Sequence, residues 1–385
     1  MLESLLVYLT LFTVMAVCGV IASRREPAYI PNSGMYAENR HFLQPEIFVL
    51  IVAFTFVFGC RWGVGVDYFH YLSSYQHGYI YSDRIEYLFK GISTLFYRNG
   101  FHFAVFFSFW ACVQITFIYL SLRKYRFVFP YLAFFLIFGS FHMSLMNVIR
   151  QQVAACIFLF SITFIENKKI IPYYLCLIIA LLIHKSAIIL VIAYPILRIK
   201  DDWFKKISLQ VIIYAICIFL SLYSSTITKW IEAPFRWFSS SFGFEEYGFS
   251  VLGIEKYNDR TQFGRNTGLG IYTNIIRNLP IIFLSNKLKK YYKSSFFNML
   301  YSLWFVCVTF GQLFSSSIVL YRPFVYLMNT QFIVTAFFSY YCFNFKKPGL
   351  QITAIIVMLV YLAMFFNNIA YGEINTSQFS FFWQN

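Results

Sequence analysis

Residues 61–68 carry an R-x-G-x-G-x-D-Y pattern that brings a cation, a carboxylate and two glycines together at the end of an apolar run. Glycine lets a backbone turn tightly or approach a ligand closely. Arg61 is suited to bind an anion there, and Asp67 is suited to act as an acid or base in a partly dry site. A structural salt bridge between Arg61 and Asp67 is the alternative interpretation, and the pattern alone does not decide between them.

Two further polar clusters interrupt apolar sequence. Arg150 is followed by Gln151 and Gln152 near the start of one run, and His184 precedes Lys185 within another. An arginine in a membrane segment is costly unless it is paired or faces an aqueous cavity. Snorkelling to the interface is the alternative for Arg150, and a purely structural role is the alternative for His184.

Two more arginines lie inside or beside apolar runs. Arg322 falls at the outer boundary of its run, whereas Arg277 lies closer to the middle of its own. A charge at that depth needs partners. The sequence leaves open whether the partners of Arg277 belong to a ligand or to neighbouring helices.

The composition places these residues in a membrane protein. Of 385 residues, 59% are apolar and only 12% are charged, whereas a soluble domain carries about a quarter charged residues. The net charge of +15 does not indicate nucleic acid, because the basic residues sit mostly at the ends of apolar runs. The eight cysteines lie singly, so we expect small buried hydrophobes and predict no metal site.

Runs of about 20 apolar residues predict membrane-spanning helices. The chain offers twelve segments, near residues 2–22, 46–60, 101–122, 127–146, 148–165, 170–183, 186–198, 207–223, 268–285, 296–314, 318–341 and 350–366. The runs are continuous rather than alternating with period two, which excludes a closed barrel. We therefore expect an all-α, polytopic integral membrane protein with about 12 transmembrane helices in a single domain over residues 1–385.

Basic residues gather after every second span, which places those connections in the cytoplasm and both termini outside. Residues 170–198 are bracketed by basic clusters at both ends, so we expect a short hairpin whose turn at His184 and Lys185 lies below the outer surface. The long outer connections, 61–98 and 224–267, are rich in aromatic residues, which suit either an interfacial belt or platforms for sugar rings. Most remaining arginines fall on the outer side, which suggests that an anion is held there.

In combination, these motifs resemble the EpsG branch of the Wzy-type polysaccharide polymerases over about residues 45–345. The matching features, in chain order, are the R-x-G-x-G-x-D-Y-x-x-Y pattern of residues 61–71, Glu86-Tyr-Leu-Phe, Ile149-Arg150-Gln151, His184-x-Ser186-Ala-Ile, and Tyr321-Arg322 before Tyr326. The resemblance implies a GT-C-like outward-facing cavity and a bacterial inner-membrane enzyme acting outside the cytoplasm. Such enzymes move a growing glycan from undecaprenyl diphosphate onto a new lipid-linked repeat unit.

This reaction suggests roles for the candidate residues. Outer carboxylates with D-x-D spacing are absent from the sequence, so arginines would stabilise the departing diphosphate in place of a metal ion, and no cofactor is predicted. Asp67 is the first candidate for the base that takes the proton of the acceptor hydroxyl, with His184 and Glu86 behind it. The diphosphate-binding candidates are Arg61, Arg150 and Arg322, with Arg265 and Arg277 in addition, and the sugar-binding candidates are Trp62, Tyr68 and Tyr71.

Other classes of membrane protein remain as alternatives. A transporter or flippase of a lipid-linked anionic glycan would also use an arginine-lined cavity, although transporters usually place ionisable groups near the midplane on helices broken in matching halves. An O-antigen ligase or a multispan acyltransferase would deliver its group to a different acceptor. The expected partners are the undecaprenyl-diphosphate-linked oligosaccharide and membrane lipid, and the sequence leaves open whether a chain-length regulator binds.

Overall fold

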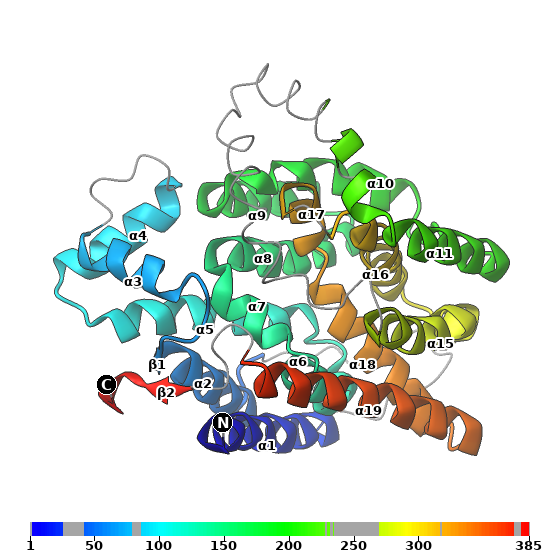
Figure 1. Ribbon diagram of the computed structural model, residues 1–385, viewed down its shortest axis with the longest axis horizontal. Helices are drawn as coiled ribbons and strands as arrows, with labels where there is room; N and C mark the ends of the chain where they lie inside the picture. Colours follow the sequence, from blue (N-terminus) through cyan, green and yellow to red (C-terminus); the bar gives the residue numbers. More distant parts are fainter. Residues whose placement is uncertain are drawn as a thin grey trace.

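Helices form nearly all of the described chain, and the longest of them run side by side (Figure 1). The computed structural model describes residues 2–25, 42–78, 86–227, 229–231, 234, 269–315, 318–372 and 379–384. A helix satisfies its own backbone hydrogen bonds, which is the requirement that lipid imposes on a spanning segment. The all-α class predicted from the continuous apolar runs is confirmed.

Five helices of the described chain are long and apolar enough to cross a membrane. They are α1 (Leu2–Arg24), α5 (Phe103–Ser121), α8 (Ile149–Glu166), α16 (Ser295–Leu313) and α19 (Pro348–Ala370). The number rises to seven if each of two bent helix pairs counts as one span. The protein is therefore a polytopic membrane protein, but twelve crossings are not confirmed by these lengths.

Shorter helices account for the other predicted spans. Helices α2 (Pro45–Gly59) and α9 (Ile170–Ile183) are apolar but have only 15 and 14 residues. Helix α11 (Ile207–Ser221) exposes Leu209, Ile212 and Ile216 along one side, as expected for a face that contacts lipid rather than water. Helix α15 (Leu269–Tyr292) extends seven residues beyond the predicted end of its span at residue 285.

Two predicted spans are broken rather than continuous. The segment 127–146 forms a short 3-10 turn η1 (Arg126–Val128), then α6 (Phe129–Phe138), and then α7 (Phe141–Asn147) after a bend of 65°. At the bend, a Cβ on Gly139 would meet the Phe135 carbonyl oxygen at 2.2 Å, so only glycine fits. The segment 318–341 divides into α17 (Ile318–Val325) and α18 (Asn329–Asn344).

The predicted hairpin of residues 170–198 is confirmed. Helix α9 is followed by η2 (Lys185–Ile192) and α10 (Ala193–Ile199), and the two arms pack on each other. The hydroxyls of Tyr173 and Tyr174 donate hydrogen bonds across the hairpin, to the carbonyls of Leu190 and Val191. His184 is extended at the turn, with φ −154° and ψ 114°. The arm α9 rises only about 21 Å at 1.5 Å per residue, less than the hydrocarbon thickness of about 30 Å.

The predicted outer connection 61–98 is itself folded. It contains a short strand β1 (Arg61–Trp62) and two helices, α3 (Tyr68–Gln76) and α4 (Tyr87–Arg98). Strand β1 pairs antiparallel with β2 (Ser380–Phe381), which precedes the last turn η4 (Phe382–Gln384). Most of the second long connection, 224–267, lies outside the described residues.

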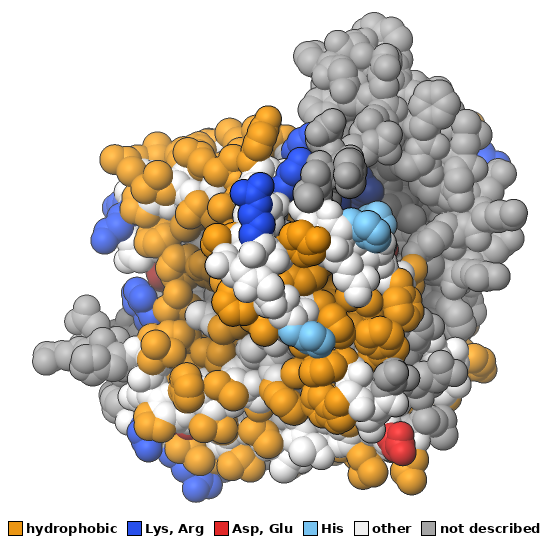
Figure 2. Space-filling view, turned by 90° about the vertical axis from the view of Figure 1, so that its left-hand side faces the viewer, with side chains coloured by type: hydrophobic (Ala, Val, Ile, Leu, Met, Phe, Trp, Pro, Cys, Tyr) orange, Lys and Arg blue, Asp and Glu red, His pale blue; other side chains and the backbone are white. Residues whose placement is uncertain are grey.

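The two ends of the described chain meet beside this strand pair. The backbone N–H of Phe379 donates to the Ser4 hydroxyl at 2.9 Å, and the Phe379 ring packs on Tyr8. Figure 2 views the end of the molecule at the left of Figure 1, where the C-terminus, α3 and α4 lie. Apolar side chains cover much of this face, basic side chains interrupt them, and acidic ones are rare (Figure 2).

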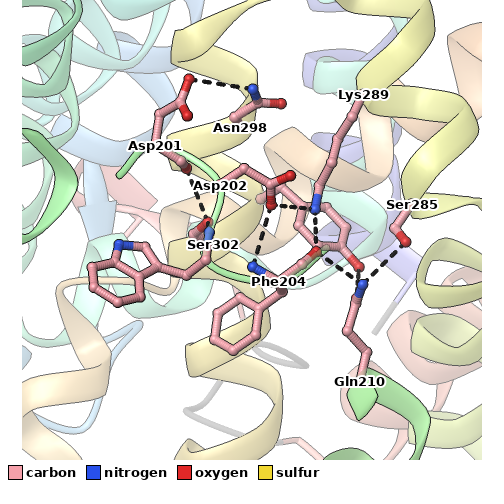
Figure 3. A network of polar contacts seen from close by, with 10 residues as sticks. Asp201, Asp202, Phe204, Gln210, Ser285, Lys289, Asn298 and Ser302 are labelled. Atoms are coloured by element: carbon pink, nitrogen blue, oxygen red, sulfur yellow. Dashed lines mark hydrogen bonds and ion pairs between the residues drawn. The ribbon is translucent and has the colours of Figure 1, made fainter. Parts of the chain in front are cut away.

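A polar network joins the connection between α10 and α11 to two neighbouring helices (Figure 3). Lys289 of α15 pairs with Asp202 Oδ1 at 2.6 Å and also donates to the carbonyl of Phe204. Asp201 accepts from the amide of Asn298 on α16 at 3.4 Å. The Lys289 side chain is only 8% exposed, so this network fixes α15 and α16 against the base of the hairpin.

Candidate functional site

The carboxylate of Glu86 lies at the centre of the candidate site. Glu86 immediately precedes α4, and its side chain is 5% exposed. Its Oε2 accepts from Arg150 Nη1 at 2.6 Å. Its Oε1 lies 3.1 Å from His184 Nδ1 and accepts from the Lys185 backbone N–H at 3.0 Å. One carboxylate thus joins the start of α8 to the turn of the α9 hairpin.

The contacts of Glu86 determine its charge. Burial alone would raise the pKa of Glu86, but the hydrogen bond from His184, the charge of Arg150 and the hydrogen bond from Lys185 N–H together lower this pKa to about 2. Glu86 is therefore ionised at neutral pH and engaged on both oxygens. A carboxylate with so low a pKa is a poor general base, which makes Glu86 a positioning residue rather than the proton acceptor considered in the sequence analysis.

Glu86 also sets the tautomer of His184. An ionised carboxylate only accepts hydrogen bonds, so the contact requires a proton on Nδ1 and leaves Nε2 of the neutral ring as an acceptor. Nε2 is buried and has no hydrogen-bond partner in the described part of the chain. This is the arrangement in which a carboxylate orients a histidine for proton transfer or for holding a substrate hydroxyl.

Asp67 lies within electrostatic reach of the same group. Burial raises the pKa of Asp67, and His70, Arg150 and Arg322 partly offset this effect. The same two arginines act on His184. The Asp67 carboxylate has no hydrogen-bond or ion-pair partner among the described residues, and the Asp67 side chain is partly exposed. Asp67 therefore combines access, an elevated pKa and two nearby cations.

Arg61 does not take the role predicted for it. Its side chain is buried, with 2% exposure, and its guanidinium donates to three backbone carbonyls, those of Phe58, Val64 and Met146. It pairs with no carboxylate, so the predicted salt bridge to Asp67 is also wrong. Arg61 instead fixes the turn of residues 61–68 against α7.

The bend before α7 completes this positioning. Because α7 turns away from α6, its last residue, Asn147, reaches the motif and accepts from the Asp67 backbone N–H through Oδ1 at 3.0 Å. Gly65 has φ +111°, a conformation that disfavours side chains, and a Cβ there would contact the Met146 carbonyl at 3.6 Å. Gly63 also has a positive φ, of +67°, so the glycines of the pattern serve the backbone turn rather than close packing.

The three predicted sugar-binding aromatic residues have different surroundings. Tyr68 is fully buried, stacks on Phe107 at 5.0 Å between ring centroids, and cannot reach a ligand, so that prediction is wrong. Tyr71 is 7% exposed and hydrogen-bonds Arg150, so it belongs to the wall of the site. Trp62 is partly exposed beside Phe103 and is the one of the three with accessible ring surface.

Three further residues, to which the sequence analysis assigned no role, belong to the site. Gln151 Nε2 donates to the Arg322 carbonyl at 2.9 Å and so links α8 to α17. The hydroxyls of Ser186 and Tyr326 lie 2.7 Å apart and link the hairpin to the segment after α17. Each of the three lies in a motif of the sequence, but only the packing of α17 against α8 and η2 brings those motifs together.

The other predicted arginines differ in their relation to this site. Arg322 is on α17 and acts electrostatically on Asp67 and His184. Arg277 lies on α15, where it packs on the ring of Tyr361 from α19, and it belongs to a separate cluster. Arg265 lies outside the described residues. Of the four predicted arginines that the structure describes, the site thus keeps Arg150 and Arg322.

The chemistry available in the described ranges is that of acids, bases and cations. No three His, Cys, Asp or Glu side chains lie together there in a way that could hold a metal ion. The two best-defined hollows are small and include neither Glu86 nor His184, so an outward-facing cavity is not confirmed for the described part of the chain.

Comparisons with known proteins identify the family of the chain. No curated protein and no solved structure matches the chain. A family model does match, over residues 47–382, a range that begins in α2 and ends in the turn that follows β2. It includes Asp67, Glu86, Arg150, His184 and Arg322. The match covers most of the chain, and the protein belongs to the EpsG family.

Proposed function

We propose that this protein is a membrane glycosyltransferase that polymerises undecaprenyl-diphosphate-linked oligosaccharide repeat units into a surface polysaccharide. Membership of the EpsG family supports a polysaccharide polymerase. The observation that carries the proposal is the ion pair of Glu86 with Arg150, which also orients His184 and lies beside Asp67 and Arg322. This group offers a cation for a diphosphate and an acid–base pair for a hydroxyl.

The leaving group of the proposed reaction is a lipid diphosphate. Its charge grows as the bond between the anomeric carbon and the diphosphate oxygen breaks. Arg150 and Arg322 would stabilise this charge, since fixed guanidinium groups in a dry site need no reorganisation at the moment of reaction. Glu86 would hold the Arg150 fork in place before substrate arrives.

The acceptor hydroxyl must lose its proton as it attacks. In our scheme the hydroxyl oxygen forms the new bond to the anomeric carbon, the diphosphate leaves with the bonding pair, and Asp67 takes the proton. One direct displacement of this kind inverts the anomeric centre. His184 Nε2, an acceptor oriented by Glu86, would hold a sugar hydroxyl, and Trp62 would offer ring surface to a sugar.

The proposed location is the bacterial inner membrane, with the site and both termini on the outer side. The hydrogen bond between Ser4 and Phe379 supports a common side for the two ends. Lys289, Lys346 and Lys347 lie at helix ends that the basic-residue rule assigns to the cytoplasm. The proposed partners are the lipid-linked oligosaccharide and membrane lipid.

The product on a gel tests the proposal. Membranes from a host without a polymerase of its own, to which this protein is supplied, should convert labelled lipid-linked repeat units into a ladder of lengthening chains. A single transfer to a lipid core would indicate a ligase instead, acylated sugar an acyltransferase, and movement of unchanged solute into liposomes a transporter. Any of these three results without a ladder would refute polymerisation.

Metal independence is a separate part of the proposal. Thorough chelation before the assay should leave the ladder intact, because arginines supply the positive charge. Loss of the ladder on chelation, followed by its return on addition of a divalent ion, would show that the arginine scheme is wrong.

A further inference from the structure

Arg277 carries a charge that no carboxylate offsets within the described chain. Its Nε donates to the carbonyl of Thr273 at 3.2 Å, and its Nη2 donates to the side-chain oxygen of Asn274. A guanidinium has five N–H groups, so three of them have no acceptor among the described residues. Arg277 lies about 12 Å along α15 from Leu269, at 1.5 Å per residue.

The surroundings of Arg277 are polar and come from four helices. Its guanidinium lies 5.0 Å from the centre of the Tyr361 ring of α19. Tyr214 of α11 donates to the carbonyl of Asn274 at 3.0 Å and accepts from the amide of Asn278 at 3.2 Å. Gln312, near the end of α16, also hydrogen-bonds Tyr214. The predicted span 268–285 would place Arg277 within the membrane, where a cation is a functional-site hypothesis whose partner must be named.

This cluster is distinct from the site around Glu86. Arg150 and Arg322 act electrostatically on His184 and Asp67, whereas Arg277 contacts Asn274 of its own helix and the ring of Tyr361 on α19. Helix α16 packs against α11 and α15 and also against α8 and α17. The two basic groups therefore lie on different helices that pack against α16. Arg150 already has Glu86 as its counter-ion, while Arg277 has none among the residues that the structure describes.

We propose that Arg277 binds the phosphate group of a second isoprenoid-linked molecule, separate from the one whose diphosphate leaves at Arg150. The inference rests on the proposed function, because polymerisation consumes two lipid-linked substrates at once. The phosphate oxygens accept from the three uncommitted N–H groups of Arg277, and the lipid tail lies along the apolar faces of α11 and α15. Arg277 is thus a substrate-binding residue for the second lipid.

Binding of farnesyl diphosphate tests this assignment without any sugar transfer. The purified full chain in a neutral detergent should bind two equivalents, and Arg277→Gln should weaken binding of one of them by roughly tenfold or more. Arg277→Lys should retain part of that affinity, and Arg98→Gln, at the exposed end of α4, is the matched control that should bind as the original protein does. A single equivalent in the original protein, or unchanged binding by Arg277→Gln, would overturn the proposal.

A labelling experiment on the unmodified protein avoids dependence on folding of the variant. A photoreactive farnesyl diphosphate should label peptides of α11 or α15 as well as peptides near Arg150. Inorganic phosphate and phosphatidylglycerol vesicles should compete poorly, since neither carries an isoprenoid phosphate. Labelling confined to α8 and α17, or equal competition by either reagent, would overturn the second site. If no polymer ladder forms but two equivalents of farnesyl diphosphate still bind, the proposed function is refuted and the second binding site is not.

Discussion

Glu86 and Arg150 form an ion pair of 2.6 Å although they lie 64 residues apart in the chain. Glu86 immediately precedes α4, and Arg150 is the second residue of α8. Because Glu86 also binds His184 and the Lys185 backbone, the pair joins the segment before α4 and the start of α8 to the α9 hairpin. The stability of the site and its readiness for an anion therefore depend on one carboxylate.

Removal of that carboxylate should destabilise the protein. In Glu86→Ala, the Arg150 charge loses its partner in a largely buried setting, and breaking one side of a buried pair costs about 3 kcal/mol. The unfolding midpoint in detergent should fall clearly below that of Glu3→Ala, a matched change at an exposed position of α1. Equal midpoints for the two variants would contradict a stabilising role for the pair.

The contribution of Glu86 should depend on pH in a defined direction. Its pKa falls from an ordinary value near 4.5 to about 2 on folding, so the folded state binds the proton more weakly than the unfolded state. The stabilisation is then fully present above about pH 5 and is lost as the pH falls toward about 2. The difference in unfolding midpoint between the original protein and Glu86→Gln should shrink over this range. A difference that stays constant from pH 6 to pH 3 would show that ionisation of Glu86 is not its source.

Asp67 should control the acidic limb of the activity profile. Burial raises the pKa of Asp67. On acidification, Asp67 therefore becomes protonated at a higher pH than an ordinary aspartate, whose pKa is about 3.9. Polymer formation should therefore decline on acidification with a midpoint above that value, and Asp67→Asn should reduce the rate by about 100-fold or more. Long chains made by Asp67→Asn at the normal rate would exclude Asp67 as the base.

Conservative replacement of the two site arginines should impair polymer formation. Arg150→Lys and Arg322→Lys keep the charge but lose the planar fork that binds two oxygens at once. We expect at least a tenfold lower rate for each, measured from the intensity of the chain ladder, corresponding to about 1.4 kcal/mol. Arg98→Lys, at an exposed position, serves as the control. Full activity of both site variants would refute the clamp on the diphosphate.

The C-terminal strand should support the motif from a distance. Phe382 N–H donates to the Cys60 carbonyl at 2.9 Å, directly before β1. Phe382→Pro removes this donor, and the expected cost is about 1 kcal/mol together with a lower polymerisation rate. Phe382→Ala keeps the N–H and loses the ring contacts with His102, Phe103 and Trp383. If both variants lose the same activity, the ring and not the strand pairing accounts for the effect.

The hairpin of residues 170–198 illustrates what charge patterning can predict. Basic clusters at both ends indicated that the chain must return to the same side of the membrane. The structure has the turn at His184, as predicted. The breaks in segments 127–146 and 318–341 were not predicted, because hydropathy averages over a window and a bend depends on local backbone packing. The bend at Gly139 requires the close approach of Phe135 and Phe141, which no composition measure detects.

Arg61 and Tyr68 show where residue type misleads. Both stand in a motif at the end of an apolar run, where a cation and an aromatic ring suit a ligand. In the structure both are buried, and the Arg61 guanidinium binds backbone carbonyls. A position near the membrane interface does not reveal whether a side chain points into the protein or out of it, since that depends on the direction in which α3 and α7 pack.

The sequence by itself determined that this is a helical membrane protein and to which family it belongs. It also gave the short list of polar residues inside apolar runs, because lipid allows few charges and those few stand out in apolar sequence. Only the tertiary structure decided which of them act together. Glu86 meets Arg150 and His184 across 64 and 98 residues, and such pairs form through the packing of α4, α8 and α9, which local patterns do not encode.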